Sequence, residues 1–514
     1  MANNSRLMER MLQPSFYPHP TVPEIELIQT HASYVFLTGD YAYKVKKEVN
    51  FGFLDYSTLA KRKYFLDTEL DLNQKVAPEL YLAVIPITYG NDELILDHSG
   101  NVDHVVEYTL KMRQFPEENL LSHLVQERKI DRHRISELGK IVAEFHQQAQ
   151  TNDYISSFGT VAKIQAAFTE NYQQSQKYIG ILQTRQQYQE TKAYSDRIFT
   201  QQQDILLHRV QGQKIRECHG DLHLNNICLW QDKILLFDRI EFNESFRFVD
   251  TMYDVAFVVM DLEAKQRADL ANAFLNSYLE YSGDWSGLLV LPLYLSRQAY
   301  VRAKVNSFLV DDPQISKTNQ IQAREAARNY YHQAYQYTQI KAGSIILMSG
   351  LSGSGKSTTA QEIASNIGAI QIRSDAVRKH LAGIALNETS KDIYTPEMTD
   401  KTYKQLLELG IMLAQAGYKI ILDAKYDRLN LRQVVIEQAQ ASQIPIKIIH
   451  CIAPMSVLRD RLNHRQNDIS DATANLLATQ QTQAEAFTPA EQALVITVDT
   501  SQPNWTKAIA NLEY

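Results

Sequence analysis

Hydrophobic and polar positions alternate along residues 25–47, and Thr38-Gly39-Asp40 interrupts this alternation as a tight turn does. The pattern predicts a β-hairpin. Residues 57–76 then show the spacing of a helix, and strand-like character returns in the runs YLAVIPI, ELILD and EYTLKMRQF. Together these elements predict a small sheet with one helix over about residues 25–110.

A mostly helical pattern follows over about residues 111–338, with one strand-rich interruption at 215–240. The pattern changes again beyond Gly343, where the runs SIILMS, AIQIR, KIILD, IKIIHCI and LVITVD alternate with helical stretches. Such alternation is typical of an α/β domain whose parallel strands are connected by crossover helices. We therefore predict a small β lobe, a larger helical lobe and a separate α/β domain, with the domain boundary between residues 341 and 342.

Length and composition agree with a folded chain of more than one domain. The 514 residues exceed what one hydrophobic core supports, and 44% hydrophobic with 22% charged residues is ordinary for globular proteins. The formal net charge of -7 disfavours broad binding to nucleic acid or to an anionic membrane. With three cysteines, no signal-like apolar run and no stretch near the ~20 apolar residues of a membrane span, the chain is expected to be cytoplasmic.

The most specific chemical signal is the glycine-rich segment between the run SIILMS and a helix-prone run. It matches the phosphate-binding P-loop pattern in the strand-loop-helix context that this pattern requires. Glycines allow backbone N–H groups to point at a phosphate, Lys356 can reach the β and γ oxygens, and Ser357 can bind Mg²⁺. The candidate nucleotide ligands are Gly350, Ser352, Gly353, Ser354, Gly355, Lys356, Ser357 and Thr358.

Charged residues after this loop complete a candidate kinase site. Asp423 ends the run KIILD, where a carboxylate can hold a Mg²⁺-bound water beside the P-loop. Asp375 follows the run AIQIR and can accept the proton of an attacking hydroxyl, with Arg378 about one helical turn further on to bind an anion. The alternative is that Ser374 or Asp375 only caps the helix.

A lid is predicted from Arg461 and Arg465, which are spaced i, i+4 and share one face of a predicted helix that can hold transferring phosphates. A solvated charged face is the alternative. The motifs GLSGSGKST, RSDAVRKHL, ILDA and RDRLNHR make residues 343–514 resemble the P-loop kinases related to gluconate kinase, the polynucleotide 5′-kinase domain and zeta-type toxins. The resemblance implies phosphorylation of a hydroxyl group but does not identify the acceptor.

A second constellation lies in the strand-rich interruption of the helical region. Asp221 is followed five residues later by Asn226, and Asp238 ends the run ILLFD twelve residues after Asn226. In a kinase catalytic loop the first Asp orients the acceptor hydroxyl, the Asn binds one Mg²⁺, and the last Asp holds the metal that bridges the phosphates. The alternatives are a metal cluster of His219, Asp221 and His223, or a polar turn between two strands.

Kinase chemistry also requires a lysine on a strand of the small lobe and a glutamate on the following helix, because the phosphates need a cation that an ion pair holds in place. Lys44 in the run AYK fits the first role, and Glu69 lies 25 residues later on the predicted helix. Lys46 has the same strand parity as Lys44. The sequence favours Lys44 but leaves the choice between the two lysines open.

The motifs HGDLHLNN, LLFD and DTMYDVA make residues 25–338 resemble the aminoglycoside-phosphotransferase-like kinases. The order of the whole chain is similar to that of bacterial proteins in which such a kinase is fused to a P-loop ATP-binding module. The resemblance implies a two-lobed α+β fold of the protein-kinase type, with Asp250 and Asp254 as structural acids.

Two further nucleotide contacts are expected from this resemblance. The sequence has no glycine-rich nucleotide loop at the expected hairpin, where Ser33 is the candidate phosphate contact. Glu107 and Tyr108 are expected where the last strand of the small lobe joins the helical lobe, with a backbone that can bind the edge of adenine.

These patterns predict a tandem ATP-dependent phosphotransferase. Each of its modules, residues 1–341 and 342–514, is expected to transfer the γ-phosphate of ATP to a hydroxyl of a small molecule, with ATP and Mg²⁺ as cofactors. The alternative is a polynucleotide 5′-hydroxyl kinase or a zeta-toxin-like kinase that the first module regulates. The acidic charge and the lack of a clear aromatic and basic stripe disfavour nucleic acid as the partner.

Overall fold

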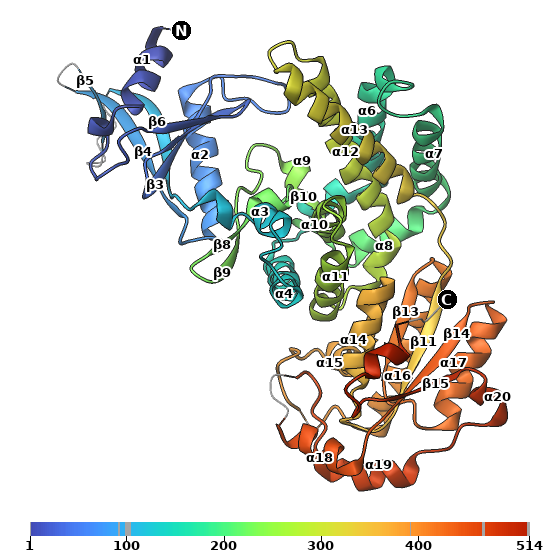
Figure 1. Cartoon of the computed structure of the whole chain (residues 1–514). Coiled ribbons are helices and arrows are strands. Elements are labelled where there is room, and N and C mark those ends of the chain that lie inside the picture. The colour runs from blue at the N-terminus through green and yellow to red at the C-terminus, as the bar shows by residue number, and fades with distance from the viewer. Residues whose placement is uncertain (1, 91–92, 98–103, 391, 465–467, 511–514) are drawn as a thin grey trace. The chain divides into compact units, whose positions relative to one another are not determined.

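The computed structural model describes residues 2–90, 93–97, 104–390, 392–464 and 468–510 (Figure 1). The backbone forms two compact units, and each unit combines segments that are distant in the sequence. The first unit comprises residues 1–130, 149–164 and 207–261, and the second comprises residues 131–148, 165–206 and 262–514.

The first unit contains an antiparallel sheet with the strand order β1-β2-β3-β6-β4-β5. Its strands are β1 (Glu26–Gln29), β2 (Ser33–Leu37), β3 (Tyr41–Lys46), β4 (Tyr81–Gly90), β5 (Glu93–Leu96) and β6 (Val105–Arg113). The hairpin predicted around Thr38 is confirmed, since β2 pairs with β3 and the Thr38 N–H donates to the carbonyl of Tyr41 at 2.9 Å. Gly39 in this turn has a φ of 107°, a backbone conformation that favours glycine.

Side chains of β3 alternate between the two faces of this sheet. Tyr43 belongs to a hydrophobic core that includes residues of α1 (Ala2–Met11), a helix that was not predicted from the sequence. Lys44 and Lys46 lie on the opposite face, where both contact α2 (Leu59–Gln74). The alternation therefore brings both lysines to the helix that carries Glu69.

The remaining elements of the first unit hold the loop that carries the kinase-like motif. β7 (Ile215–Glu217) pairs with β10 (Phe248–Asp250), and β8 (Ile227–Trp230) pairs with β9 (Lys233–Leu236). The accompanying helices are α3 (Leu121–Gln126), α5 (Asp153–Ser156) and α9 (Glu244–Arg247), and α10 (Thr251–Ala264) contains residues of both units. The predicted strand-rich interruption is confirmed, and the motif loop lies between β7 and β8.

The second unit contains helices of the predicted helical lobe. They are α4 (Arg132–Gln148), α7 (Arg185–Gln201), α11 (Ala268–Ser282), α12 (Leu291–Asp311) and α13 (Lys317–Gln336), while α6 (Val161–Ser175) and α8 (Gln203–Gln211) contain residues of both units. α4 and α11 pack closely at Gly139, where a Cβ atom would lie 2.6 Å from the carbonyl oxygen of Phe274. Across the described part of the chain, no helix has the length and apolar character needed to cross a membrane.

The second unit also contains the predicted parallel sheet, with the strand order β12-β13-β11-β14-β15. Its strands are β11 (Ser344–Ser349), β12 (Ile370–Arg373), β13 (Lys419–Asp423), β14 (Ile446–Ile452) and β15 (Val495–Asp499). The helices of this domain are α14 (Lys356–Ile367), α15 (Ser374–Ala382), α16 (Pro396–Gln415), α17 (Leu429–Ala441), α18 (Met455–His464), α19 (Leu477–Gln483) and α20 (Pro489–Gln492). All strand pairs are parallel, so the predicted α/β class is confirmed.

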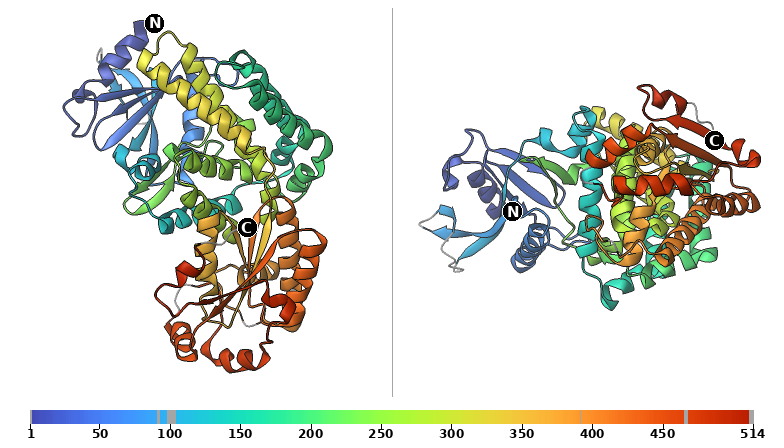
Figure 2. Two further views of the ribbon diagram at one scale, coloured as in Figure 1. Left: turned by 45° about the vertical axis from the view of Figure 1, so that its right-hand side comes forward. Right: turned by 90° about the horizontal axis from the view of Figure 1, so that it is seen from below.

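Helices cover both faces of the parallel sheet (Figures 1 and 2). Ile421 of β13 packs in one core with Ala360 and Ile363 of α14. Leu422 lies on the other face, where a Cβ atom on Gly410 of α16 would lie 3.1 Å from Leu422 Cδ1. Because successive strand residues are buried on opposite faces, the strands are apolar along their whole length, which is why they were visible in the sequence.

Candidate active sites

The loop between β7 and β8 is held by a buried carboxylate. The N–H groups of His219 and Gly220 donate to Asp254 at 2.7 and 2.9 Å, which agrees with the structural role expected for this acid. Gly220 has a φ of 88°, and a Cβ atom on it would lie 2.5 Å from the carbonyl oxygen of Phe246. The loop therefore requires glycine at this position.

His219 does not fit the alternative of a metal cluster. Its Nε2 lies 2.8 Å from the carbonyl oxygen of Phe237, and its Nδ1 accepts the N–H of Asp221 at 3.4 Å. Burial lowers the pKa of His219, so the ring is neutral and donates from Nε2. Both ring nitrogens are thus engaged within the loop, and His219 supports the backbone that carries Asp221.

The structure brings Asp221, Asn226 and Asp238 to one site in the first unit. Asn226 Nδ2 donates to the backbone oxygen of Asp221 at 3.0 Å, and the N–H of Asp238 donates to the hydroxyl of Tyr81 at 3.0 Å. The side chains of Asp221 and Asp238 are 40% and 45% exposed, so both carboxylates can reach a bound molecule. Asp238 has a φ of 61°, which is uncommon outside glycine but more frequent for Asp and Asn.

Lys44 is the lysine that faces this site. Its Nζ lies 2.7 Å from Glu69 Oε1 and 3.0 Å from Asp238 Oδ1, and its side chain is 15% exposed. Lys46 lies 2.8 Å from Glu69 Oε2 and also pairs with Glu241, and its side chain is only 1% exposed. Glu69 thus holds both lysines, but only the contact of Lys44 leads to Asp238.

The protonation of Lys44 follows from these neighbours. Burial lowers the pKa of the amine, but Asp238 and Glu69 more than compensate, and the pKa lies well above its ordinary value. Lys44 is therefore a cation at neutral pH. Carboxylate and amide oxygens from Asp238 and Asn226 are the hard ligands that Mg²⁺ prefers, so the donor set fits a magnesium ion beside this lysine.

The structure revises where one expected nucleotide contact lies in the small lobe, while the adenine and phosphate contacts themselves stay predictions. The prediction that Glu107 and Tyr108 lie at the junction of the lobes is wrong, because both lie inside β6, which continues to Arg113. Glu107 is buried against Arg62 at 2.8 Å, and its strand pairs with β4. The junction begins after Arg113. Ser33 is buried at the start of β2, where its N–H donates to Thr30 Oγ1 at 2.9 Å, and its contact with phosphate stays a prediction.

The P-loop of the second unit adopts a conformation that three glycines permit. Gly350, Gly353 and Gly355 have φ values of 137°, 79° and 83°. A Cβ atom on Gly350 would lie 2.3 Å from the carbonyl oxygen of Cys451, so the close approach to β14 also requires glycine. The predicted ligands Ser352 and Ser354 lie between these glycines. α14 starts directly after them, with Lys356, Ser357 and Thr358 in its first turn.

Lys356 is oriented along this loop but has no carboxylate within ion-pair distance among the described residues. Its Nζ donates to the carbonyl oxygen of Leu351 at 2.8 Å, and burial lowers the pKa of the amine. A phosphate bound in the loop would stabilise the protonated amine of Lys356. The N-terminus of α14 would in turn stabilise the negative charge of the phosphate. The loop and Lys356 therefore fit a nucleotide phosphate.

Asp423 ends β13 beside the P-loop and is 4% exposed. Gln371 of the neighbouring strand donates from Nε2 to Asp423 Oδ2 at 2.8 Å and to the backbone oxygen of Ser357 at 3.3 Å. Arg373 Nε lies 3.9 Å from the same Asp423 oxygen. Gln371 and Arg373 were not predicted as site residues. They are two residues apart in β12, so their side chains lie on the same face of the strand, the face that meets Asp423. The hydroxyl of Ser357 and the carboxylate of Asp423 supply hard oxygen ligands that fit Mg²⁺.

Asp375 lies in the first turn of α15. The N-cap of this helix is Arg373, so neither Ser374 nor Asp375 occupies the capping position, although an acid in the first turn also stabilises a helix through its dipole. Tyr394 donates to Asp375 at 3.4 Å and to Asp471 at 3.1 Å. Burial raises the pKa of Asp375, which makes it a stronger base when ionised.

The predicted arginines have different positions. Arg378 is buried, donates to the carbonyl oxygen of Ile393 and to Thr399, and lies over the ring of Tyr394, so in this structure it braces the segment before α16. Its binding of an anion stays a prediction. Arg461 of α18 donates to the carbonyl oxygen of Gly353 at 3.2 Å and to Thr500 Oγ1 at 2.8 Å, which ties the predicted lid helix to the P-loop. Arg465 lies outside the described residues.

A cavity of about 590 Å³ opens beside the P-loop. It is lined by Gly350 and Leu351 of the loop, by His450 at the end of β14, and by Phe487 after α19. The ring of His450 meets the ring of Phe487 edge to face at a centroid distance of 5.0 Å. This space can accommodate part of a small substrate or nucleotide next to the phosphate-binding loop.

The fold and the two sites define the class of this protein: an antiparallel β lobe and a helical lobe of the kinase type, followed by a parallel P-loop α/β domain. Residues 345–489 match the family described as AAA domain. This P-loop domain implies nucleotide binding.

Relatives and solved structures were also found for larger parts of the chain. The chain is 28% identical over 467 residues to a protein of Mycobacterium tuberculosis described as uncharacterized, and the match covers 90% of each chain. A choline/ethanolamine kinase family protein from Mesorhizobium loti is similar at 8% identity, with 65% of this chain and 99% of that chain covered and a TM-score of 0.37. A gluconokinase from Sinorhizobium meliloti is similar at 24% identity, with 33% and 89% covered and a TM-score of 0.24.

Proposed function

We propose that the protein is a tandem ATP-dependent phosphotransferase whose modules, residues 1–341 and 342–514, each transfer the γ-phosphate of ATP to a hydroxyl of a small molecule. The observation that carries the proposal is the position of Lys44 Nζ between Glu69 and Asp238, with Asp221 and Asn226 on the adjoining loop. A cation fixed by a carboxylate next to a metal-binding acid is the arrangement that phosphoryl transfer from ATP requires.

In the first module the residues divide the work by their positions. Lys44 binds phosphate oxygens of ATP, and Asn226 and Asp238 hold Mg²⁺, which when bound neutralises phosphate charge. Asp221 is exposed on the same loop and accepts the proton of the acceptor hydroxyl. Glu69 fixes the lysine, so the cation is in place before the nucleotide binds.

In the second module the P-loop binds the β-phosphate through its N–H groups, and Lys356 binds the β and γ oxygens. Ser357 and Asp423 hold Mg²⁺. Asp375 accepts the proton of the acceptor hydroxyl, a role supported by its position after β12 at the carboxyl edge of the sheet, where α/β domains bind substrates. Arg461 donates to the carbonyl oxygen of Gly353 in the loop, and from this position its positive charge stabilises the phosphate that is being transferred.

A phosphate-transfer screen tests this function. The full chain is incubated with γ-labelled ATP, Mg²⁺ and panels of sugars, amino alcohols, aminoglycosides, nucleosides and RNA ends. We expect each module to label at least one small-molecule hydroxyl. The first module is measured in a chain whose P-loop module is silenced by Lys356→Ala, and the P-loop module is measured in a chain whose first module is silenced by Asp238→Asn. Label appearing only on RNA ends would instead establish a polynucleotide kinase, and a chain that binds ATP without Mg²⁺-dependent transfer to any acceptor would contradict the proposal.

Paired substitutions of the two lysines separate binding from stability. We expect Lys44→Met to weaken Mg²⁺-ATP binding by the first module by roughly tenfold or more, because it removes the cation that faces Asp238. Lys46→Met leaves Glu69 and Glu241 without this partner in the interior, so its main effect is a loss of about 3 kcal/mol or more of unfolding free energy. Calorimetric titration with ATP and thermal unfolding measure the two effects. Stronger loss of ATP binding in a folded Lys46→Met protein would assign the phosphate contact to Lys46.

A further inference from the structure

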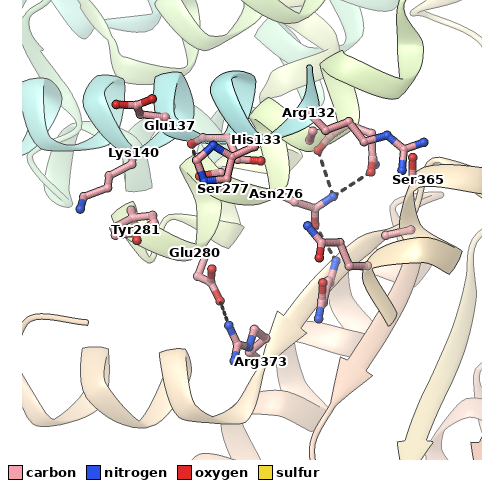
Figure 3. Close-up of a pocket in the computed structure, with 16 residues that line it drawn as sticks. Arg132, His133, Glu137, Lys140, Asn276, Ser277, Glu280, Tyr281, Ser365 and Arg373 are labelled. Atoms are coloured by element: carbon pink, nitrogen blue, oxygen red, sulfur yellow. Dashed lines mark hydrogen bonds and ion pairs between the residues drawn. The ribbon is translucent and has the colours of Figure 1, made fainter. Parts of the chain in front are cut away.

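Strand β12 forms the edge of the parallel sheet, and a helix takes the place of a further strand beside it (Figure 3). The side-chain amide of Asn276 on α11 donates from Nδ2 to the carbonyl oxygen of Ala369 at 3.1 Å and accepts the N–H of Gln371 at Oδ1 at 2.7 Å. Asn272, one turn earlier on α11, donates to the same carbonyl at 2.9 Å. The side-chain amide of Asn276 thus pairs with one backbone carbonyl and one backbone N–H at the edge of the sheet, as the backbone of a neighbouring strand would.

This contact leads directly to the predicted metal ligand of the P-loop domain. The backbone of Gln371 is held by Asn276, and its side chain donates to Asp423 Oδ2 at 2.8 Å. The same side chain reaches the backbone oxygen of Ser357. Gln371 therefore connects α11 with both residues proposed to hold Mg²⁺.

A second connection runs through charge. Glu280, two turns after Asn272 on α11, lies 3.4 Å from Arg373. The two side chains point toward each other in Figure 3. Arg373 also lies 3.9 Å from Asp423 and 2.6 Å from Asp468. The arginine is thus a cation shared by three carboxylates, one of which is the proposed metal ligand.

The face between α11 and the P-loop domain depends on such polar contacts. A cavity of about 370 Å³ lies there, lined by residues of α4, α11, α14 and β12. His380 of α15 adds a contact of 2.7 Å to the carbonyl oxygen of Glu280. All of these elements belong to the second compact unit, so α11 and β12 are parts of one structural body.

We propose that Asn276 and Glu280 are positioning residues for the P-loop module: they hold Gln371 and Arg373 against Asp423 and thereby set the Mg²⁺ concentration that nucleotide binding requires. The proposal rests on the function proposed for residues 342–514. It means that this module, although its P-loop motif is complete, uses a helix from the preceding part of the chain to organise its metal site.

The direction of the effect follows from electrostatics. With Glu280 ionised, part of the positive charge of Arg373 is neutralised away from Asp423. Burial raises the pKa of Glu280 and the Arg373 guanidinium opposes this rise, so the measurement is made at pH 8, because a higher pH favours the ionised carboxylate. Without the Glu280 charge, Arg373 keeps Asp468 but is attracted more strongly to Asp423. Arg373 then competes with Mg²⁺ for the Asp423 carboxylate.

Mg²⁺-dependent binding of a fluorescent ADP analogue to the full chain tests the proposal. The signal of the P-loop site is the difference between each protein and the same protein carrying Lys356→Ala. We expect Glu280→Gln and Asn276→Ala each to raise the Mg²⁺ concentration at half-saturation by about threefold or more, roughly the effect of one screened charge or one lost positioning bond. In an Arg373→Gln background, Glu280→Gln should cause no further shift, because its partner is gone.

Two matched controls separate positioning from loosening of the helix contact. Asn272→Ala removes a bond to Ala369, whose carbonyl keeps its bond from Asn276. It also removes the Asn272 Oδ1 acceptor of Asn276 Nδ2, but that amide keeps the backbone oxygen of residue 272. Glu137→Gln changes a carboxylate that lines the same cavity but pairs with Arg134. Both should retain the Mg²⁺ requirement of the unmodified chain. Thermal unfolding checks the fold of each variant, and Glu280→Gln, which keeps the side-chain shape, carries the test if Asn276→Ala unfolds.

The outcomes distinguish this inference from the function on which it rests. An unmodified chain whose Mg²⁺-dependent binding equals that of Lys356→Ala would refute the nucleotide site itself. Normal binding by the unmodified chain, with an unchanged Mg²⁺ requirement in Glu280→Gln, would overturn only the positioning role. Equal shifts in Asn272→Ala and Asn276→Ala would also overturn it, because the effect would then not pass through Gln371.

Discussion

Asp221→Asn is expected to lower phosphate transfer by the first module by roughly 10²-fold or more while leaving Mg²⁺-ATP affinity almost unchanged, whereas Asp238→Asn should weaken Mg²⁺-ATP binding as well. The reason is position. Asp238 lies 3.0 Å from Lys44 and is the proposed metal ligand, while Asp221 is exposed on the loop before it, where it can reach the acceptor hydroxyl. Asparagine tolerates the left-handed backbone of residue 238, so the substitution tests the charge rather than the fold.

The measurement uses the full chain with the P-loop site silenced by Lys356→Ala. Calorimetry reports Mg²⁺-ATP affinity without knowledge of the acceptor, and labelled ATP reports transfer. Asp204→Asn, which alters an exposed acid on α8, is the matched control and should change neither quantity. If Asp221→Asn abolished Mg²⁺-ATP binding and Asp238→Asn left it intact, the two roles would be reversed or the kinase interpretation would fail.

Lys356→Ala is expected to lower nucleotide turnover by the P-loop module by roughly 10²-fold or more, because it removes the cation that stabilises charge on the transferring phosphate. The first module should continue to bind ATP. Calorimetry on the full chain therefore has a clear expected result: one of the nucleotide-binding events seen with the unmodified chain disappears and the other keeps its affinity.

Lys419→Ala provides the comparison for this change. Lys419 starts β13, at the end of the sheet opposite the carboxyl edge where Asp423 lies, and should affect neither binding nor turnover. Turnover is measured with Asp221→Asn in the first module, so that the remaining activity comes from the P-loop. Undiminished turnover by the Lys356→Ala chain would show that the P-loop does not act on nucleotide in the proposed way.

Much of the candidate chemistry was predictable because its residues are close in the sequence. The P-loop is one continuous segment, and its glycines are needed for the positive φ values that the structure contains at Gly350, Gly353 and Gly355. Asp221, Asn226 and Asp238 occur within one loop and the hairpin after it, so their spacing already limited how far apart they can lie. The strands of the parallel sheet were visible because burial on both faces requires apolar residues throughout.

Long-range contacts decided the points on which local pattern was silent. Lys44 and Lys46 have the same parity in β3, and they are distinguished by distant partners: Asp238, 194 residues after Lys44, approaches Lys44, whereas Glu241 approaches Lys46. Glu107 and Tyr108 were placed at the lobe junction because their apolar neighbours do not mark where a strand ends, whereas pairing with β4 and β3 carries β6 on to Arg113.

The residues around Asp423 show the same division between local sequence and tertiary structure. The sequence by itself determined that an acid ends an apolar strand and that a P-loop follows another strand, since each of these motifs is one continuous segment of the chain. Tertiary structure alone decided that Gln371 and Arg373 meet this acid and that Asn276 and Glu280 of α11 hold them. The physical reason is that an edge strand exposes unpaired backbone groups without specifying their partner, and a polar helix face about a hundred residues earlier in the chain can supply it only once the chain has folded.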